Sequence, residues 1–306
     1  MNFKLYPASY IFGLFIFMSP IIVMSADNYY LIWAGLEISL FGFLPLFATS
    51  YTIDSMIKYF IFQASGSSLF MISMLFNSTL AFSMSLAMKL GMFPFFYWVP
   101  MVFMSFTWDG CLVVSSVQKL SPLILILLKQ SPTLLLLAVL SVLVGGLKGM
   151  NQTYMKKMMA YSSISHTGWM VTCCFVSVKL LLIYLVIYFL FNNNLMLVLK
   201  KTNKRKVEVM TYKWDLRHLP DNPKMKINYS FMALAGLPPF PIFIIKVLVL
   251  LSINNFLGMF LLLGSMLSAY YYVNIFVNTV AISSPPSSKF PNNMNLSWIV
   301  ILLLML

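Results

Sequence analysis

Four charged side chains lie well inside long apolar stretches of the sequence: Glu37, Lys89, Lys119 and Lys246. A charge at the centre of a membrane helix costs roughly 2.5–3.5 kcal/mol on insertion scales, so the set costs about 10 kcal/mol. Ionisable groups at membrane depth mark function by default, although a snorkelling lysine or a structural ion pair is the alternative for any one of them.

Proton transfer is the chemistry that this set fits best. A lysine removed from water holds its proton less tightly, and a nearby carboxylate restores its hold. A lysine whose carboxylate can approach or withdraw would therefore act as a switchable proton carrier. Glu37 is the only carboxylate inside an apolar stretch, so we expect it to be the partner of Lys89.

His166, in the segment YSSISHTGW (161–169), is a fifth candidate. Two interpretations remain open for His166: a role in proton transfer, or a buried histidine whose hydrogen bonds are satisfied by the protein. His218 lies in a basic segment and is expected to be solvated. The sequence has two histidines and three cysteines without ligand spacing, which does not support a haem or metal site. No glycine-rich phosphate loop is present to support ATP-driven pumping.

The composition shows what must hold these groups. The chain has 306 residues, of which 60% are hydrophobic and 9% charged, with a mean hydropathy of +0.88. An ordinary soluble domain is about 45–50% apolar and about 25% charged. Continuous apolar runs such as 134–146 and 180–191 also argue against a transmembrane β-barrel. We therefore expect an all-α polytopic membrane protein and exclude a soluble enzyme.

The apolar stretches leave room for about eleven helices of membrane-spanning length. The predicted ranges are 8–24, 29–48, 55–76, 79–104, 108–128, 133–149, 156–175, 178–199, 226–252, 255–280 and 295–306. All belong to one membrane domain, residues 1–306.

Two of these helices should be broken. The fourth contains Gly91 and Pro94, and the ninth contains Gly236, Pro238 and Pro239. Proline removes a backbone donor and clashes with the preceding turn. Because the fourth and ninth helices are an odd number apart, they cross the membrane in opposite directions. This arrangement indicates two inverted five-helix repeats, about 8–128 and 133–280, followed by a C-terminal helix at about 295–306. Paired broken helices point to an ion path.

The loop charges indicate an orientation. The chain carries a formal net charge of +13. Residues 200–226 hold nine basic and three acidic residues, so +6 of the total lies around one long loop, predicted at about 200–225. Basic loops of a polytopic protein face the matrix or cytoplasm. We therefore place the N-terminus and the basic loops on the matrix or cytoplasmic side, and we do not expect nucleic acid to bind.

Several segments resemble subunit 2 of mitochondrial NADH:ubiquinone oxidoreductase, respiratory complex I, in its short animal form. The similarity runs in order from about residue 8 to 280. It is carried by GLEISLFGFLP (35–45), IKYFIFQASGSS (57–68), MKLGMFPFFYWVP (88–100), VQKLSP (117–122), GGLKGMNQTYMKKMMAYSSISHTGWM (145–170) and ALAGLPPFPIFIIK (233–246).

The resemblance implies an antiporter-like, proton-pumping membrane-arm subunit of the mitochondrial inner membrane, driven by redox chemistry in other subunits. It implies that Glu37 and Lys89 govern an inner half-channel, that Lys119 is central, and that Lys246 faces the exit. FMN, iron–sulfur clusters and ubiquinone would belong to other subunits, and this chain would carry no cofactor. The short form lacks three N-terminal helices, so other membrane-arm subunits should pack against that flank, with lipid elsewhere.

Two further interpretations remain open. A Na⁺ or K⁺/H⁺ antiporter subunit would share the fold and the buried lysines, although a stand-alone antiporter should keep the first three helices. A structural subunit that assembles the complex without pumping would not need the buried charges.

Overall fold

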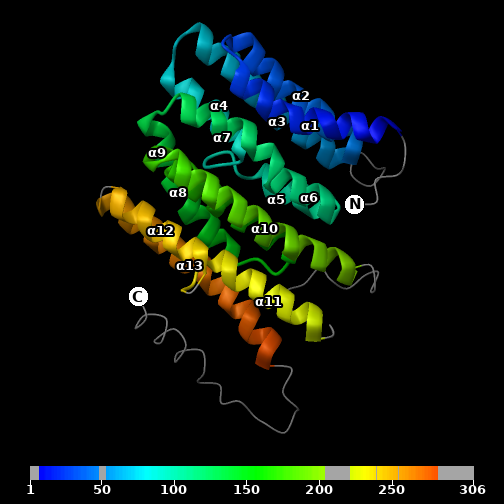
Figure 1. Ribbon diagram of the computed structural model, residues 1–306, viewed down its shortest axis with the longest axis vertical. Coiled ribbons are helices and arrows are strands. Elements are labelled where there is room, and N and C mark those ends of the chain that lie inside the picture. The colour runs from blue at the N-terminus through cyan, green and yellow to red at the C-terminus, as the bar shows by residue number, and fades with distance from the viewer. Residues whose placement is uncertain (1–6, 48–52, 204–220, 239, 254, 282–306) are drawn as a thin grey trace.

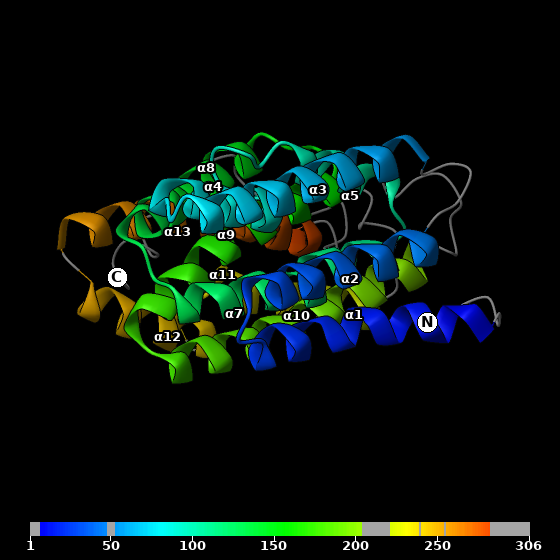
Figure 2. The ribbon, with the colours of Figure 1, turned by 90° about the horizontal axis from the view of Figure 1, so that it is seen from above.

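The computed structural model describes residues 7–47, 53–203, 221–238, 240–253 and 255–281. Every regular element in these ranges is helical. Figure 1 shows the helices stacked side by side, with α1 to α3 at one edge, α11 to α13 at the other, and α8 to α10 between them. Figure 2, from above, shows that the stack is more than one helix deep.

The helices follow the apolar runs of the sequence. The first half contains α1 (Pro7–Ser25), α2 (Tyr29–Phe47), α3 (Ile53–Leu75), α4 (Thr79–Leu90), α5 (Trp98–Ser105), α6 (Trp108–Ser115), the short 3₁₀ helix η2 (Val117–Lys119) and α7 (Leu120–Leu128). The second half contains α8 (Pro132–Met150), α9 (Met155–Val176), α10 (Val178–Asn203), α11 (Asp221–Ala235), α12 (Pro241–Ser252) and α13 (Asn255–Ala281).

Helical segments occupy ten of the eleven predicted ranges, and the eleventh, 295–306, lies outside the described residues. The count of eleven and the inverted repeats therefore stay predictions. Within the described part, five segments are long and apolar enough to cross a membrane. They are Tyr29–Phe47, Trp108–Leu128, Pro132–Met150, Val178–Lys201 and Asn255–Val277.

Both expected interruptions are present. The fourth predicted helix divides into α4 and α5, and the ninth divides into α11 and α12. Gly91 and Gly236 end the first member of each pair with positive φ angles of 68° and 71°. Such angles are adopted readily by glycine alone, so these two residues define where the helices stop.

A third interruption was not expected. The range 108–128 was predicted as one helix, but α6 ends at Ser115 and α7 begins only after η2. Ser116 has φ −122° and ψ −79°, which is not helical. Pro122 has no N–H to donate to the carbonyl of Gln118, and its ring clashes with that turn. The prediction of two broken helices was therefore wrong, because a third predicted helix is also interrupted. Pro122 explains this additional break.

Both ends of the predicted basic loop are also helical. Helix α10 continues to Asn203, and α11 begins at Asp221 rather than near residue 226. The sequence Asp-Asn-Pro at 221–223 suits a first helical turn, where a missing proline N–H has no partner to lose. Residues 204–220, which hold most of the basic segment, lie outside the described residues.

Helix α9 forms the centre of the molecule. Its residues from Met158 to Cys174 are buried without a gap, although many are polar. The hydroxyls of Ser162, Ser163 and Ser165 donate to backbone carbonyls three residues earlier in the same helix. A polar helix can exist at membrane depth only when protein surrounds it. Helix α9 therefore supplies a polar axis that lipid does not reach.

Candidate functional site

Lys89 lies at the first helix break, in the last turn of α4, and is 6% exposed. A Cβ at Gly66 of α3 would lie 3.0 Å from Lys89 Cγ, so this glycine lets the lysine pass close to the α3 backbone. The carbonyls freed by the break are occupied. Gln63 Nε2 donates to the Lys89 carbonyl at 3.1 Å, and Trp98 Nε1 donates to the Met88 carbonyl at 3.1 Å. The Lys89 ammonium donates no hydrogen bond to a described residue and is left free to move.

Glu37 lies beside α3, as Lys89 does. Its Oε1 accepts a hydrogen bond from Ser67, the neighbour of Gly66. No ion pair within 4 Å joins Glu37 to Lys89; among the described residues that geometry occurs only between Lys200 and Asp109. Glu37 is half-buried, whereas the candidate lysines are buried.

Lys119 lies in the third break, where η2 joins α7, and is 6% exposed. Its Nζ donates to the Ser163 carbonyl of α9 at 2.9 Å. The neighbouring Gln118 donates to the Ser39 carbonyl of α2 at 3.0 Å, two residues after Glu37. At the unexpected break, Lys119 therefore bonds to α9, while the adjacent Gln118 bonds to α2.

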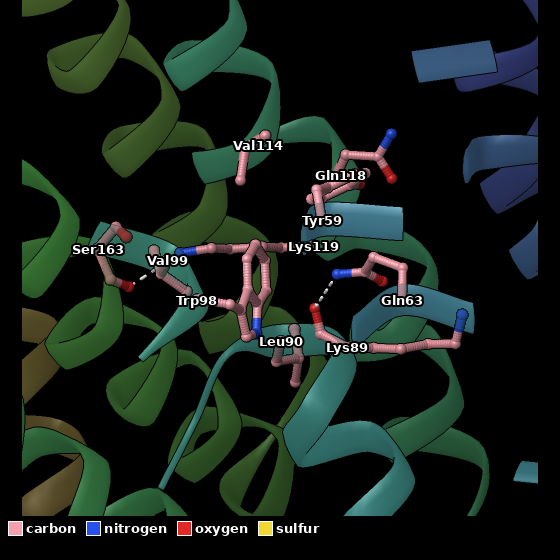
Figure 3. A pocket seen from close by; sticks show the side chains of 10 residues that line it. All are labelled: Tyr59, Gln63, Lys89, Leu90, Trp98, Val99, Val114, Gln118, Lys119 and Ser163. Atoms are coloured by element: carbon pink, nitrogen blue, oxygen red, sulfur yellow. Dashed lines mark hydrogen bonds between the residues drawn. The ribbon is translucent and has the colours of Figure 1, made fainter. Parts of the chain in front are cut away.

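One small cavity connects Lys89 and Lys119. It has a volume of about 10 Å³, roughly the room for a single water molecule. Figure 3 shows both lysines beside this cavity, with their ammonium groups directed away from each other. The residues that line it are Tyr59, Gln63, Lys89, Leu90, Trp98, Val99, Val114, Gln118, Lys119 and Ser163.

His166 continues the line along α9. It lies three residues, close to one turn, beyond Ser163 and is 3% exposed. Its Nδ1 lies 2.8 Å from the hydroxyl of Tyr184 in α10. The ring of Tyr188, also in α10, lies 4.9 Å from the His166 ring and 5.9 Å from Lys119 Nζ. Aromatic side chains of α10 therefore bridge Lys119 and His166.

Lys246 lies at the other break, in the second turn of α12, and is 6% exposed. Its Nζ donates to the Ala235 carbonyl at the end of α11 at 3.2 Å. It also lies 5.5 Å from the ring centre of Trp169, three residues beyond His166 on α9. A Cβ at Gly236 would lie 3.0 Å from this ammonium, so the glycine leaves the space that the lysine occupies.

The five candidate side chains therefore follow one path across the molecule. Ser163, His166 and Trp169 share one face of α9, and they contact Lys119, the α10 tyrosines and Lys246 in turn. Lys119 and Lys89 line one cavity, and Glu37 bonds to Ser67, the neighbour of the Gly66 that Lys89 passes. Of the expected helix-break residues, Pro94 lies in the α4–α5 turn and Pro238 in the α11–α12 turn, whereas Pro239 lies outside the described residues.

Sequence reasoning missed the polar partners on α10. Tyr184, Tyr188 and Asn192 are buried and four residues apart, so they share one helix face. Asn192 donates to the Ser115 hydroxyl at 2.8 Å, beside the unexpected break. The spacing of four residues between these polar side chains, inside an apolar run, was the sequence signal that could have identified them. Gln63 and Ser67 were missed because uncharged polar residues are common in membrane helices.

No group of three metal-ligating side chains occurs in the described ranges. Cys111, Cys173 and Cys174 are free and buried. The cysteines contribute packing.

The sequence matches a known family and curated relatives. The family model for the transmembrane domain of NADH:quinone oxidoreductases and Mrp antiporters covers residues 73–283, which include four of the five candidates. NADH-ubiquinone oxidoreductase chain 2 of Coturnix japonica is 32% identical, over 90% of this chain and 86% of the relative. The chain belongs to the NADH-ubiquinone oxidoreductase chain 2 family. The family's counterpart in Mus musculus is 31% identical over 92% of this chain and 86% of its own.

Solved structures share the fold of this chain 2 family member. A chain of respiratory complex I from Thermus thermophilus matches with a TM-score of 0.77 and 20% identity, over 97% of this chain and 75% of its own. A chain of the Mrp complex from Dietzia matches with a TM-score of 0.73 and 12% identity, over 89% of this chain and 59% of its own. At these identities the likeness concerns the fold alone.

Proposed function

We propose that the chain is a proton-translocating membrane-arm subunit of NADH:ubiquinone oxidoreductase in the mitochondrial inner membrane. Membership in the chain 2 family supports the assignment to that enzyme. The observation that carries the mechanism is the line of buried lysines at helix breaks, because a fold that only scaffolds a complex gains nothing from these charges. The redox chemistry would take place in other subunits.

The path begins with the pair of Glu37 and Lys89. Since Lys89 Nζ has no hydrogen bond to a described residue, its position can respond to the charge state of Glu37. Moving toward the carboxylate would favour the protonated lysine, and moving away would favour release. A proton released from Lys89 would cross to Lys119 through the water-sized cavity that both residues line, after the Lys89 ammonium swings back from the outward direction that it has in Figure 3.

The path continues from Lys119 to Lys246. The hydroxyl of Tyr184 and the ring nitrogens of His166 can each donate and accept, which proton transfer requires. Lys246 then lies against Trp169 and the open end of α11. We assign the proton path to Glu37, Lys89, Lys119, His166 and Lys246, in the order of their positions.

The orientation is supported by three contacts at one end of the molecule. Lys156, at the start of α9, donates to the carbonyls of Met104 and Phe106. Lys200, at the end of α10, pairs with Asp109 at the start of α6. The start of α6, the start of α9 and the end of α10 therefore share one membrane face. Its excess of lysine supports the matrix side.

A partner subunit is proposed for the flank formed by α1 and α2. Glu37 is half-buried in this chain alone, and an ionised carboxylate that faces lipid is expensive. Protein or bound water must complete its surroundings. We therefore expect another membrane-arm subunit to cover α2 near Glu37.

Cation antiport is the second candidate, because the Mrp complex shares the fold. A cation path would need oxygen ligands along the line. Glu37 is the only carboxylate on it, so proton transfer is favoured. Pumping that requires Na⁺ or K⁺ in place of protons would support the second candidate.

Replacement of Lys119 tests the proposal. In the assembled enzyme reconstituted in vesicles, Lys119→Ala should lower the proton-to-electron ratio, and Lys119→Arg should do the same because guanidinium does not release its proton. Lys179→Ala is the matched control, since this lysine is exposed outside the line. Assembly should be measured alongside. A normal ratio in an assembled Lys119→Ala enzyme would contradict the pumping role.

A further inference from the structure

The short helix α5 is held at both of its ends by lysines that lie outside the proposed proton path. Lys156, in the first turn of α9, donates to the carbonyl of Met104 at 3.2 Å and to that of Phe106 at 2.8 Å. Met104 lies in the last turn of α5, and Phe106 directly follows this helix. The last carbonyls of a helix have no partner within the helix, and the helix dipole favours a positive charge there. Lys156 therefore completes the C-terminal end of α5.

Lys148, in the last turn of α8, contacts the other end of α5. Its Nζ lies 4.5 Å from the ring centre of Tyr97 and 4.7 Å from that of Phe96, and it donates to the Tyr97 hydroxyl at 3.3 Å. The two rings are stacked on each other, with their centres 4.1 Å apart. Because Tyr97 directly precedes α5, the lysine holds the start of this helix. The attraction of a cation to an aromatic face is modest at an exposed site, so this end is held less firmly than the other.

Both lysines come from one hairpin, which α8 and α9 form with the loop at 151–154. Glycines bring these two helices close together. A Cβ at Gly145 of α8 would lie 2.8 Å from the Ser165 nitrogen of α9, and one at Gly168 of α9 would lie 2.6 Å from the Ala138 carbonyl of α8. Small residues let membrane helices approach this closely. The hairpin is therefore a tightly packed frame to which α5 is attached at two points.

The position of α5 determines one wall of the cavity between Lys89 and Lys119. Trp98 and Val99, the first two residues of α5, line this cavity, and so does Ser163 of α9. The Ser163 carbonyl also holds Lys119. A shift of α5 relative to α9 would therefore change the distance across a cavity that has room for only about one water molecule.

We propose that Lys148 and Lys156 are positioning residues, which clamp α5 onto the α8–α9 hairpin and so set the width of the cavity between Lys89 and Lys119. The inference rests on the proposed proton-translocating function, and it gives a task to two lysines that carry no proton in that function. Helix α5 has only eight residues and no side-chain cap at its start. A helix of this length is marginal by itself, so contacts from outside must hold it.

Lys156→Met tests the clamp in the assembled enzyme reconstituted in vesicles. It keeps the length of the side chain and removes the donor from both carbonyls. Both bonds are only part-buried, so water can replace the lysine and the enzyme should assemble. We expect the proton-pumping rate per assembled enzyme to fall about tenfold, because a misplacement of about 1 Å can cost about 100-fold in rate. Lys148→Met should lower the rate less, since its contact is weaker.

Lys157→Met is the matched control for Lys156→Met. Lys157 is the adjacent residue, and its ammonium lies 5.4 Å from the ring centre of Tyr154 and bonds to none of the described residues of α5. This variant should pump normally. A loss in Lys157→Met as large as that in Lys156→Met would show that the charge of this segment matters and not the hold on α5, which would overturn the clamp.

Lys156→Arg separates a positioning lysine from a proton carrier. A guanidinium group can donate to both carbonyls, but it does not release its proton. The arginine variant should therefore pump at a normal rate, whereas Lys119→Arg should not. A loss in Lys156→Arg equal to that in Lys156→Met would show that Lys156 itself carries protons, and it would overturn the positioning role.

The remaining outcomes separate the clamp from the proposed function. Normal pumping in Lys156→Met, together with a loss in Lys119→Ala, would overturn the clamp and leave the function standing. Normal pumping in both would overturn the function itself. If Lys156→Met does not assemble, Lys148→Met decides, because its contact is exposed. Normal pumping in that variant would then overturn the clamp, and a loss that Lys148→Arg restores would support it, since arginine also stacks on aromatic rings.

Discussion

At both expected helix breaks the first helix ends at a glycine with a positive φ angle, but the lysines beside the two breaks differ in their hydrogen bonds. At the α4–α5 break, neutral donors from Gln63 and Trp98 occupy the freed carbonyls, and the Lys89 ammonium has no hydrogen bond to a described residue. At the α11–α12 break, the ammonium of Lys246 itself occupies the Ala235 carbonyl. The ammonium of Lys89 is therefore not bonded to the backbone at the first break, whereas the ammonium of Lys246 is bonded to the backbone at the second.

This difference assigns different tasks to similar residues. A lysine that is not needed to satisfy the backbone can move in response to a carboxylate, as Lys89 can toward Glu37. A lysine that completes a helix end cannot move without exposing a carbonyl at membrane depth, which is costly. We therefore expect Lys89 to be the responsive member and Lys246 the fixed member of the path.

Substitution of Gly91 should have the largest effect. A Cβ there would lie 2.3 Å from Val99 Cγ2, and φ is +68°. Backbone strain and overpacking together should cost about 3 kcal/mol or more in Gly91→Ala. We expect much less assembled enzyme, measured by native electrophoresis of membranes.

Gly236→Ala is the matched comparison for Gly91→Ala. It shares the positive φ, but its Cβ would meet the flexible end of Lys246 at 3.0 Å. The enzyme should therefore assemble in larger amounts than Gly91→Ala while pumping less than the unchanged enzyme. Equal assembly of the two variants would show that backbone strain alone, and not the neighbouring side chain, decides the outcome.

Removal of the two lysine head groups should have the next largest effect on stability. Lys246→Met leaves the Ala235 carbonyl without its donor, at a cost of about 1–3 kcal/mol. Lys89→Met removes a buried charge and orphans no carbonyl, so it should leave the melting temperature unchanged or raise it. Thermal melting of the purified enzyme measures both. A larger loss in Lys89→Met would reverse the assignment of responsive and fixed lysines.

The two breaks also show how much of the site could be predicted from the sequence. Glycine and proline within apolar runs predicted both breaks, and the isolated charges in those runs predicted the candidate lysines. The break beside Lys119 was missed, although Pro122 marks it, because one proline within an apolar run can kink a membrane helix without ending it. Glu37 was predicted as the partner of Lys89, but the backbone carbonyls that hold Lys119 and Lys246 could not be predicted. Whether Gln63 or the lysine itself occupies a freed carbonyl depends on which helices become neighbours, and single-chain patterns do not encode that.

Trp98→Phe should have the smallest effect and tests how completely the first break is satisfied. The Met88 carbonyl accepts from Trp98 Nε1 at 3.1 Å and also from the Gly91 N–H at 3.3 Å. Loss of the indole donor therefore leaves that carbonyl with one partner, and the cost should be only about 0.5–1.5 kcal/mol. A small drop in melting temperature with normal pumping is the expected result. A pumping defect as large as that of Lys119→Ala would mean that Trp98, which lines the cavity between Lys89 and Lys119, acts on the proton path itself.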